Sequence, residues 1–161
     1  MIRAMQDSDG PKVLEIYAFG LKTRNATFET QVPTWDKWTA KHLNHSRFVY
    51  EYNGEVAGWV ALSPVSTREV YKGVAEVSIY IGEKYLGQGI GTKLMQTVIE
   101  SSEANGIWTL HTSLFPENVA SVRLHKKFGF REVGIREKIA RLDGIWRNTL
   151  ILERRSTVVG V

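Results

Sequence analysis

The feature that most constrains the fold is the stretch YLGQGIGTKLM, residues 85–95, in which three glycines stand at alternate positions. Before it, residues 73–81 (GVAEVSIYI) are β-branched and apolar almost throughout, which is typical of a buried central strand. After it, apolar residues recur at helical spacing to about residue 105. Glycines at such a junction indicate a backbone that turns sharply or comes close to a ligand.

Helical and strand patterns also mark the remaining elements. Helices are predicted over residues 7–20, 33–46, 89–105 and 117–130. Strands are predicted on both sides of the Asn53–Gly54 turn, over 73–81 and 107–115, and on both sides of the Asp143–Gly144 turn. Asn-Gly and Asp-Gly pairs between β-rich runs favour tight hairpins. The order of elements predicts an α/β domain with a mixed sheet.

The 161 residues fit a single domain, because no repeat, low-complexity stretch or linker divides the chain. We expect residues 1–155 to form that domain. The last six residues, STVVGV (156–161), have no periodic partner and are expected to be disordered. No apolar run is long enough for a membrane span, the first residues lack a signal-peptide pattern, and the chain has no cysteine. These features favour a cytoplasmic protein that does not bind membranes.

The charge pattern argues against a nucleic-acid partner. The formal net charge is +4, and Arg154–Arg155 is the only tight basic pair. No Lys/Arg run is interleaved with aromatic residues, as a surface that binds nucleic-acid strands would need. His42, His45 and His111 show no metal-like pairing with carboxylates, so no metal site is predicted.

A glycine turn between a strand and a helix can hold an anion. The N–H groups of the first helical turn are unpaired and lie at the positive end of the helix dipole, which favours phosphate. The dinucleotide fingerprint, counted from Gly87, fails at Thr92, and no Gly-Lys-Ser/Thr follows for a Walker A loop. From spacing alone, the glycines either bind a phosphate group or simply permit a tight turn.

Two motifs resemble those of the GNAT superfamily of acetyl-CoA-dependent N-acetyltransferases. The pattern Q/R-x-x-G-x-G/A closes on Gly89 and Gly91, and the later Asn, Ser and Gly-Phe motif matches ENVASVRLHKKFGF, residues 117–130. The resemblance implies a mixed, mostly antiparallel central sheet flanked by helices, with the cofactor site at the junction of strand, glycine turn and helix. Leu86 replaces the Gln or Arg that opens the first motif. We therefore expect weaker cofactor affinity, not its loss.

The resemblance also implies which residues hold the cofactor. Backbone groups of the central strand would bind the pantetheine arm, at Ile79, Tyr80 and Ile81. The glycine turn would bind the pyrophosphate through Gly87, Gln88, Gly89, Ile90, Gly91 and Thr92. The second motif would contact the cofactor arm through Asn118 and Ser121. Acetyl-CoA is thus the expected co-substrate.

Shorter matches resemble one group within the superfamily, the phosphinothricin and methionine sulfone or sulfoximine acetyltransferases. They are ATFET (26–30), the pair Arg68 and Tyr71, AEVSIYI (75–81) and DGIWRNTLIL (143–152). The resemblance implies a homodimer that acetylates a small amino acid or analogue. It also implies an acceptor pocket lined by Phe28, Glu29, Arg68 and Tyr71. An arginine there could clamp a carboxylate or phosphinate, or it could be a solvated loop cation.

Acetyl transfer from a thioester to an amine needs a base for the amine and a proton for the leaving thiolate. Glu76 is the best base candidate, because it is the one carboxylate in an otherwise apolar strand, where burial would make it more basic. The alternatives are a structural carboxylate or a base that acts only through water. His125 lies where many GNAT members carry a tyrosine proposed as general acid. It could also be a packed or surface imidazole.

The leading hypothesis is an N-acetyltransferase that acts on a small amino acid or analogue. A second hypothesis is a protein acetyltransferase that acts on an N-terminus or a lysine. A third is a non-catalytic acyl-CoA-binding module, in which Leu86 marks the decay of the cofactor motif. The sequence does not identify the acceptor, because short and variable loops determine it.

Overall fold

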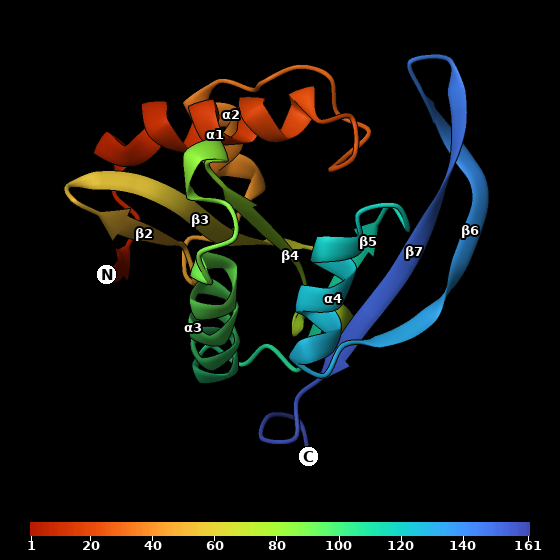
Figure 1. Cartoon of the computed structure of the whole chain (residues 1–161). Helices are drawn as coiled ribbons and strands as arrows, with labels where there is room; N and C mark the ends of the chain where they lie inside the picture. The colour runs from red at the N-terminus through yellow and green to blue at the C-terminus, as the bar shows by residue number, and fades with distance from the viewer.

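The computed structural model describes all 161 residues, and its elements follow the predicted order (Figure 1). The strands are β1 (Ile2–Ala4), β2 (Phe48–Tyr52), β3 (Glu55–Pro64), β4 (Val74–Ile81), β5 (Thr109–Leu114), β6 (Arg131–Leu142) and β7 (Ile145–Arg155). The helices are α1 (Gly10–Lys22), α2 (Trp35–Lys41), α3 (Ile90–Ala104) and α4 (Val119–Lys127). Short 3₁₀ turns cover Asp7–Asp9, Glu69–Tyr71 and Glu83–Tyr85.

The seven strands form one sheet in the order β1-β2-β3-β4-β5-β7-β6. Every neighbouring pair is antiparallel except β4 and β5, which run parallel. The expected mixed, mostly antiparallel sheet is therefore confirmed. The parallel ladder is short and ends where Glu76 pairs with His111. Beyond Glu76, the edge of β4 that faces β5 has no strand partner, so the sheet opens between these two strands.

Helices cover both faces of the sheet. In Figure 1, α1 and α2 lie above the part formed by β2 to β4, and α3 lies below it. Val60 and Leu62 of β3 belong to the core that includes α3, whereas Trp59 and Ala61 belong to the core that includes α1 and α2. Successive residues of a strand point to opposite faces, so an apolar strand needs cover on both.

The helix α2 is shorter than predicted. The sequence pattern indicated a helix over 33–46, but α2 ends before His42, whose backbone is extended (φ −97°, ψ 152°). Its start is as expected, because Oγ1 of Thr34 accepts the N–H of Lys37 at 3.3 Å. The guanidinium of Arg47 donates to the carbonyl oxygen of His42 at 2.8 Å. The Arg47 side chain therefore provides a hydrogen-bond donor for a carbonyl oxygen that has no partner within the helix.

β6 and β7 form a long hairpin that projects from the body of the molecule (Figure 1). Its register shifts after Arg136, where residues 137–139 of β6 face only Asn148 of β7. Lys138 in this bulge has a left-handed φ of 45°. Its N–H donates to Oδ1 of Asn148 at 2.8 Å, which holds the strained residue in place. The bulge bends β6 along its length.

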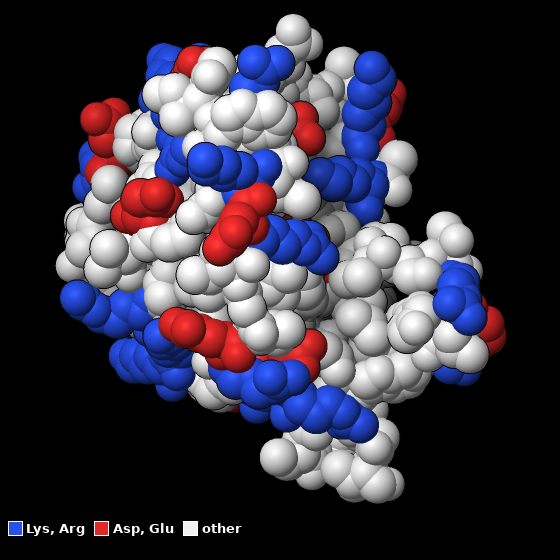
Figure 2. Space-filling view, turned by 90° about the vertical axis from the view of Figure 1, so that its right-hand side faces the viewer, with Lys and Arg blue, Asp and Glu red and all other residues white.

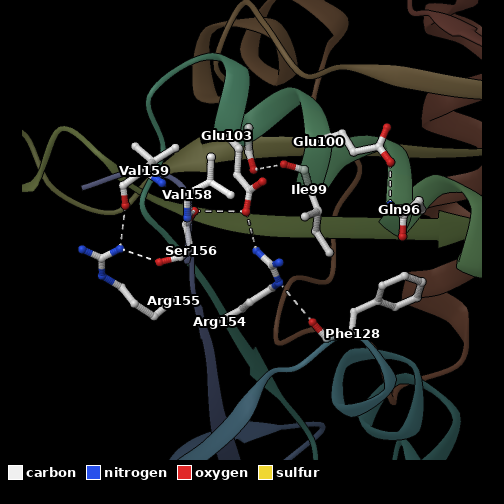
Figure 3. Close-up of polar contacts among 11 residues, drawn as sticks. Gln96, Ile99, Glu100, Glu103, Phe128, Arg154, Arg155, Ser156, Val158 and Val159 are labelled. Atoms are coloured by element: carbon white, nitrogen blue, oxygen red, sulfur yellow. Dashed lines mark hydrogen bonds and ion pairs between the residues drawn. The ribbon is translucent and has the colours of Figure 1, made fainter. Parts of the chain in front are cut away.

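The last six residues fold back on the protein, whereas the sequence led us to expect disorder (Figure 3). Arg155 donates to the carbonyl oxygen of Val159 at 2.8 Å. Glu103, at the end of α3, accepts hydrogen bonds from Nη1 of Arg154 at 3.0 Å and from Oγ of Ser156 at 3.1 Å. These contacts tie the end of β7 and the tail to α3. The sequence offers no periodicity that would reveal them, because they are single long-range contacts.

Three general properties concern possible partners. None of the helices is long and apolar enough to cross a membrane. On the face shown in Figure 2, Lys and Arg side chains are interspersed with Asp and Glu side chains. No group of three or more His, Asp or Glu side chains is arranged so that it could hold a metal ion.

Candidate active site

A cavity of about 860 Å³ lies where β4 and β5 separate. The two strands line it through Glu76–Ile81 and Thr112–Leu114, and Phe115 directly after β5 lines it as well. Its other walls come from α4, from α2, from the β6–β7 hairpin and from the loop of residues 23–34 that joins α1 to α2. Elements far apart in the sequence therefore surround one space that is large enough for a small ligand.

The glycine turn leads from β4 into α3, and Leu86 in this turn lines the cavity. Gly87 and Gly89 have left-handed φ values of 76° and 77°, which only glycine adopts without strain. A Cβ at either position would meet no atom within 4 Å, so the space in front of the turn is open. The N–H of Lys93 donates to the carbonyl oxygen of Gly89 at 3.3 Å and begins the helical ladder. The N–H groups of residues 90–92 precede this ladder and are free to bind an anion.

The free edge of β4 forms another part of the cavity. Ile79, Tyr80 and Ile81 line the cavity and lie beyond the short ladder with β5. Their edge can pair with an extended chain of amides, as a further strand would. The ring of Tyr80 packs 5.1 Å from that of Tyr17 and 5.0 Å from that of Trp59. Burial raises the pKa of Tyr80 above its ordinary value, so its hydroxyl stays protonated.

The start of α4 adds a polar group to the same cavity. Oδ1 of Asn118 accepts the N–H of Ser121 at 3.4 Å and caps the helix, and both residues line the cavity. The amide nitrogen of Asn118 has no partner in the protein, so it can donate to a ligand. Residues 87–92 do not line the cavity itself but directly follow Leu86, which does. Two of the three predicted cofactor segments therefore line the cavity, and the third adjoins it through Leu86.

Glu76 lines the cavity, but it is not buried as we expected, since 46% of its side chain is exposed. The parallel pairing of β4 and β5 places His111 beside it, with Nδ1 3.7 Å from Oε2 of Glu76. Sequence reasoning missed this neighbour, because only the strand register brings the two residues together. A half-exposed carboxylate in a cavity can exchange a proton with an amine or with water.

His125 is the buried polar residue of α4, with 1% of its surface exposed. Its Nδ1 lies 2.7 Å from the carbonyl oxygen of Ser121, which accepts only if Nδ1 carries the proton. Nε2 is buried without a partner, and the residue lines the cavity. Burial lowers the pKa of His125, which favours a neutral ring. Nε2 is then an acceptor, so this geometry opposes the predicted role of general acid.

The structure separates the four predicted acceptor residues. Phe28 and Glu29 line the cavity, and the ring of Phe28 packs edge-on against Phe115 at 4.9 Å. Arg68 and Tyr71 lie outside the cavity in the exposed loop between β3 and β4. There the guanidinium of Arg68 lies 5.3 Å from the centre of the Tyr71 ring. Arg68 therefore does not form the predicted clamp within this chain.

Three other cations line the cavity, namely Lys37 and Lys41 of α2 and Arg136 of β6. None of them forms an ion pair within the chain. Lys37 and Lys41 are four residues apart, so one face of α2 presents both ammonium groups. Helical spacing in the sequence could have identified this pair, whereas nothing in the sequence indicated Arg136.

His42 completes the wall next to α2. Its ring stacks on that of Trp38 at 4.0 Å, and its Nδ1 lies 2.6 Å from the carbonyl oxygen of Trp38. Burial lowers the pKa of His42 to about 4. The ring is therefore neutral at pH 7 and forms part of the aromatic wall without adding charge.

The sheet opens between two parallel strands, next to a glycine turn and a helix N-terminus, which is the arrangement that the resemblance to acetyl-CoA-dependent acetyltransferases led us to expect. Residues 11–130 match the Acetyltransferase (GNAT) family. The chain belongs to this family, and it is an N-acetyltransferase. The family indicated by the two sequence motifs is confirmed.

Two curated relatives and one solved structure match nearly the whole chain. The phosphinothricin N-acetyltransferase of Alcaligenes faecalis is 28% identical over 160 residues, covering 95% of this chain and 81% of the relative. The L-methionine sulfoximine/L-methionine sulfone acetyltransferase of Pseudomonas aeruginosa is 28% identical over 158 residues, covering 94% and 92%. A phosphinothricin acetyltransferase from Sinorhizobium meliloti in complex with AcCoA matches with a TM-score of 0.89 at 23% identity, covering 99% of this chain and 90% of that one.

Proposed function

We propose that the protein acetylates the amine of a small amino acid or analogue of the phosphinothricin, methionine sulfone or methionine sulfoximine type. The observation that carries the proposal is one cavity that holds the unpaired cations Lys37, Lys41 and Arg136 together with the carboxylate of Glu76. Cations suit the carboxylate and the second polar head of such an analogue, and a carboxylate suits its amine. The relatives named above are acetyltransferases for acceptors of this kind.

In this proposal acetyl-CoA lies along the free edge of β4. Its pantetheine amides pair with the backbone of residues 79–81, and its pyrophosphate binds the N–H groups of residues 90–92. Asn118 donates to the cofactor arm, with Ser121 beside it. Leu86 offers no hydrogen-bond donor, so the turn must hold the pyrophosphate through backbone groups.

Glu76 takes a proton from the ammonium of the acceptor, directly or through one water, and the neutral nitrogen attacks the thioester carbon. The C–N bond forms, and a backbone N–H on the β4 edge stabilises the oxyanion. Collapse of the tetrahedral intermediate breaks the C–S bond. One of the two protons on the attacking nitrogen passes to the thiolate, which leaves as the free thiol of coenzyme A, and the other proton stays on the amide product.

Steady-state thiol release with acetyl-CoA and a panel of amines tests this function. We expect the highest kcat/KM with small amino acids or analogues that carry a carboxylate and a second polar head. Higher kcat/KM with free N-terminal or lysine peptides would favour a protein acetyltransferase instead. Calorimetric binding of acetyl-CoA without thiol release for any amine would favour a non-catalytic module.

We also propose that the protein is a cytoplasmic homodimer. The β6–β7 hairpin leaves large apolar side chains in solvent, with 57% of Ile135, 64% of Ile145 and 55% of Trp146 exposed. Such side chains are typical of a surface that another chain covers. Sedimentation equilibrium of the purified protein at micromolar concentration tests the assembly, and a single monomeric species would contradict it.

A further inference from the structure

The loop of residues 23–34 forms much of the acceptor side of the cavity. It has no helix or strand of its own. The residues of this loop that line the cavity are Thr23, Asn25, Ala26, Thr27, Phe28, Glu29, Gln31 and Pro33. A wall without regular structure can keep its shape only through contacts with its surroundings.

The hydrogen bonds that anchor this loop come from one side chain. Other hydrogen bonds of the loop lie within it or join it to the flanking helices α1 and α2. Arg147 of β7 is the residue that connects the loop to another part of the protein by hydrogen bonds. Nη1 of Arg147 donates to the carbonyl oxygen of Arg24 at 2.8 Å, and Nη2 donates to Oδ1 of Asn25 at 3.1 Å. Arg24 also pairs with Asp143 in the β6–β7 turn, at 3.3 Å. The hairpin thus holds the start of the loop.

The same guanidinium reaches the cofactor side. Its central carbon lies 3.9 Å from the centre of the Phe115 ring, and Nη2 lies 3.4 Å from a carboxylate oxygen of Glu117. Phe115 in turn packs against Phe28 of the loop. Glu117 directly precedes Asn118, the cap of α4. Only 17% of the Arg147 side chain is exposed, although its partners Arg24 and Glu117 lie at the surface.

We infer that Arg147 is a positioning residue that fixes the acceptor wall, residues 23–34, against the β5–α4 connection. Arg147 does not line the cavity, so it acts through the loop and not on the substrate. A planar guanidinium can donate to two acceptors while it stacks on an aromatic ring, which a lysine ammonium cannot do. The inference rests on the proposed function in one respect, namely that this loop walls the acceptor site.

The test compares Arg147→Ala and Arg147→Lys with the control Arg131→Ala. Arg131 lies on the same hairpin, but 66% of its side chain is exposed and its ion-pair partner is Glu153 of β7, away from the loop. Loss of the anchor should raise the acceptor KM by about ten- to hundred-fold in Arg147→Ala, as expected for charged hydrogen bonds. Affinity for acetyl-CoA should stay within about twofold, and Arg147→Lys should recover only part of the loss. The control should behave as wild type.

Amide hydrogen exchange of residues 23–34 in the protein without substrate gives a readout that does not depend on activity. We expect faster exchange in this loop for both Arg147 variants and unchanged exchange in α3. Unchanged exchange in the loop of a folded variant would overturn the inference, whatever the enzyme acetylates. An equal loss of acceptor and acetyl-CoA binding, with exchange raised throughout the chain, would show a general structural role and would also overturn it. If the wild type acetylates no small amino acid, the proposed function fails, but the exchange comparison still decides the role of Arg147.

Discussion

The two ends of the cavity are built in different ways. At the proposed cofactor end, most of the groups offered to the ligand belong to the backbone of regular elements, the edge of β4 and the first turn of α3, and Asn118 adds one side chain. At the acceptor end, they are side chains from α2, from β6 and from an irregular loop. A backbone site persists when side chains change, whereas a side-chain site changes with every substitution. In the proposed function, the fold therefore determines the acetyl donor, and a few side chains determine the acceptor.

The largest effect is expected where the two ends meet. Glu76→Gln keeps the volume of the side chain and removes its ability to take a proton, so kcat should fall by about 10²–10⁴-fold. Affinity for acetyl-CoA should be kept, because the backbone edge of β4 is unchanged. The deficit should shrink at high pH, where the free amine already predominates. Thiol-release rates across a pH series check this, and a deficit that is constant with pH would indicate a structural role instead.

The acceptor end should also be the acid-sensitive part of the molecule. Burial holds the pKa of His42 at about 4, against 6.5 for an ordinary imidazole. As the pH falls, His42 takes up its proton at a higher pH in the unfolded chain than in the folded protein. Protonation therefore favours the unfolded chain, so the free energy of unfolding is highest above pH 6.5 and decreases as the pH falls towards 4. The free energy of unfolding should drop by at most about 3 kcal/mol over this window.

Urea unfolding at a series of pH values measures this loss. His42→Gln should unfold with a shallower pH dependence between 6.5 and 4, because the substituted side chain does not titrate. Equal slopes for the variant and the wild type would show that other groups cause the acid sensitivity. His45 and His125 also have pKa values lowered by burial, so part of the slope should remain.

The cofactor end can be tested with two matched glycines. Gly89 in the turn and Gly54 in the β2–β3 hairpin have almost the same φ, 77° and 78°, and a Cβ at either would lie in open space. Valine should strain both positions by about 1–3 kcal/mol. Only Gly89→Val should also lose acetyl-CoA affinity, by about ten- to hundred-fold, since the pyrophosphate must approach that backbone. Calorimetric titration of both variants with acetyl-CoA compares their affinities. Equal affinities would show that the glycine turn does not bind acetyl-CoA.

The smallest effect concerns the cations around the acceptor. Lys41→Ala should raise the acceptor KM by about fivefold, in line with the modest energy of an exposed ion pair, and high salt should reduce the difference. Arg68→Ala should leave KM nearly unchanged, because Arg68 stacks on Tyr71 outside the cavity. The opposite result would place the loop between β3 and β4 at the acceptor site.

Sequence patterns predicted the secondary structure at the proposed cofactor end well, because it depends on local signals. The strand over 73–81, the glycine turn and the helix from 89 appear as β4, the turn and α3, within one residue of the predicted bounds. A run of β-branched residues, a left-handed glycine and helical spacing are properties of neighbouring residues. They can therefore be recognised without the rest of the structure.

The acceptor end was predicted poorly, because it depends on contacts between distant segments. Glu76 meets His111 only through the register of two strands, and Arg136 enters the cavity from a bulged hairpin. The end of α2 before His42 was also missed. Arg47 donates to the carbonyl oxygen of His42 and so stabilises a shorter helix, and the helical spacing of apolar residues does not reveal this contact. The spacing of residues along the sequence predicts neither the burial of a side chain nor the register between two strands.

The most direct test of the difference between the two ends is a two-substrate steady-state experiment. Initial rates are measured at several concentrations of both acetyl-CoA and the acceptor for Gly89→Val, Lys41→Ala and the wild type. We expect Gly89→Val to raise the KM for acetyl-CoA and leave the acceptor KM within about twofold of the wild type. Lys41→Ala should show the reverse. If each variant changes both constants equally, the two ends do not bind their ligands separately and the account is contradicted.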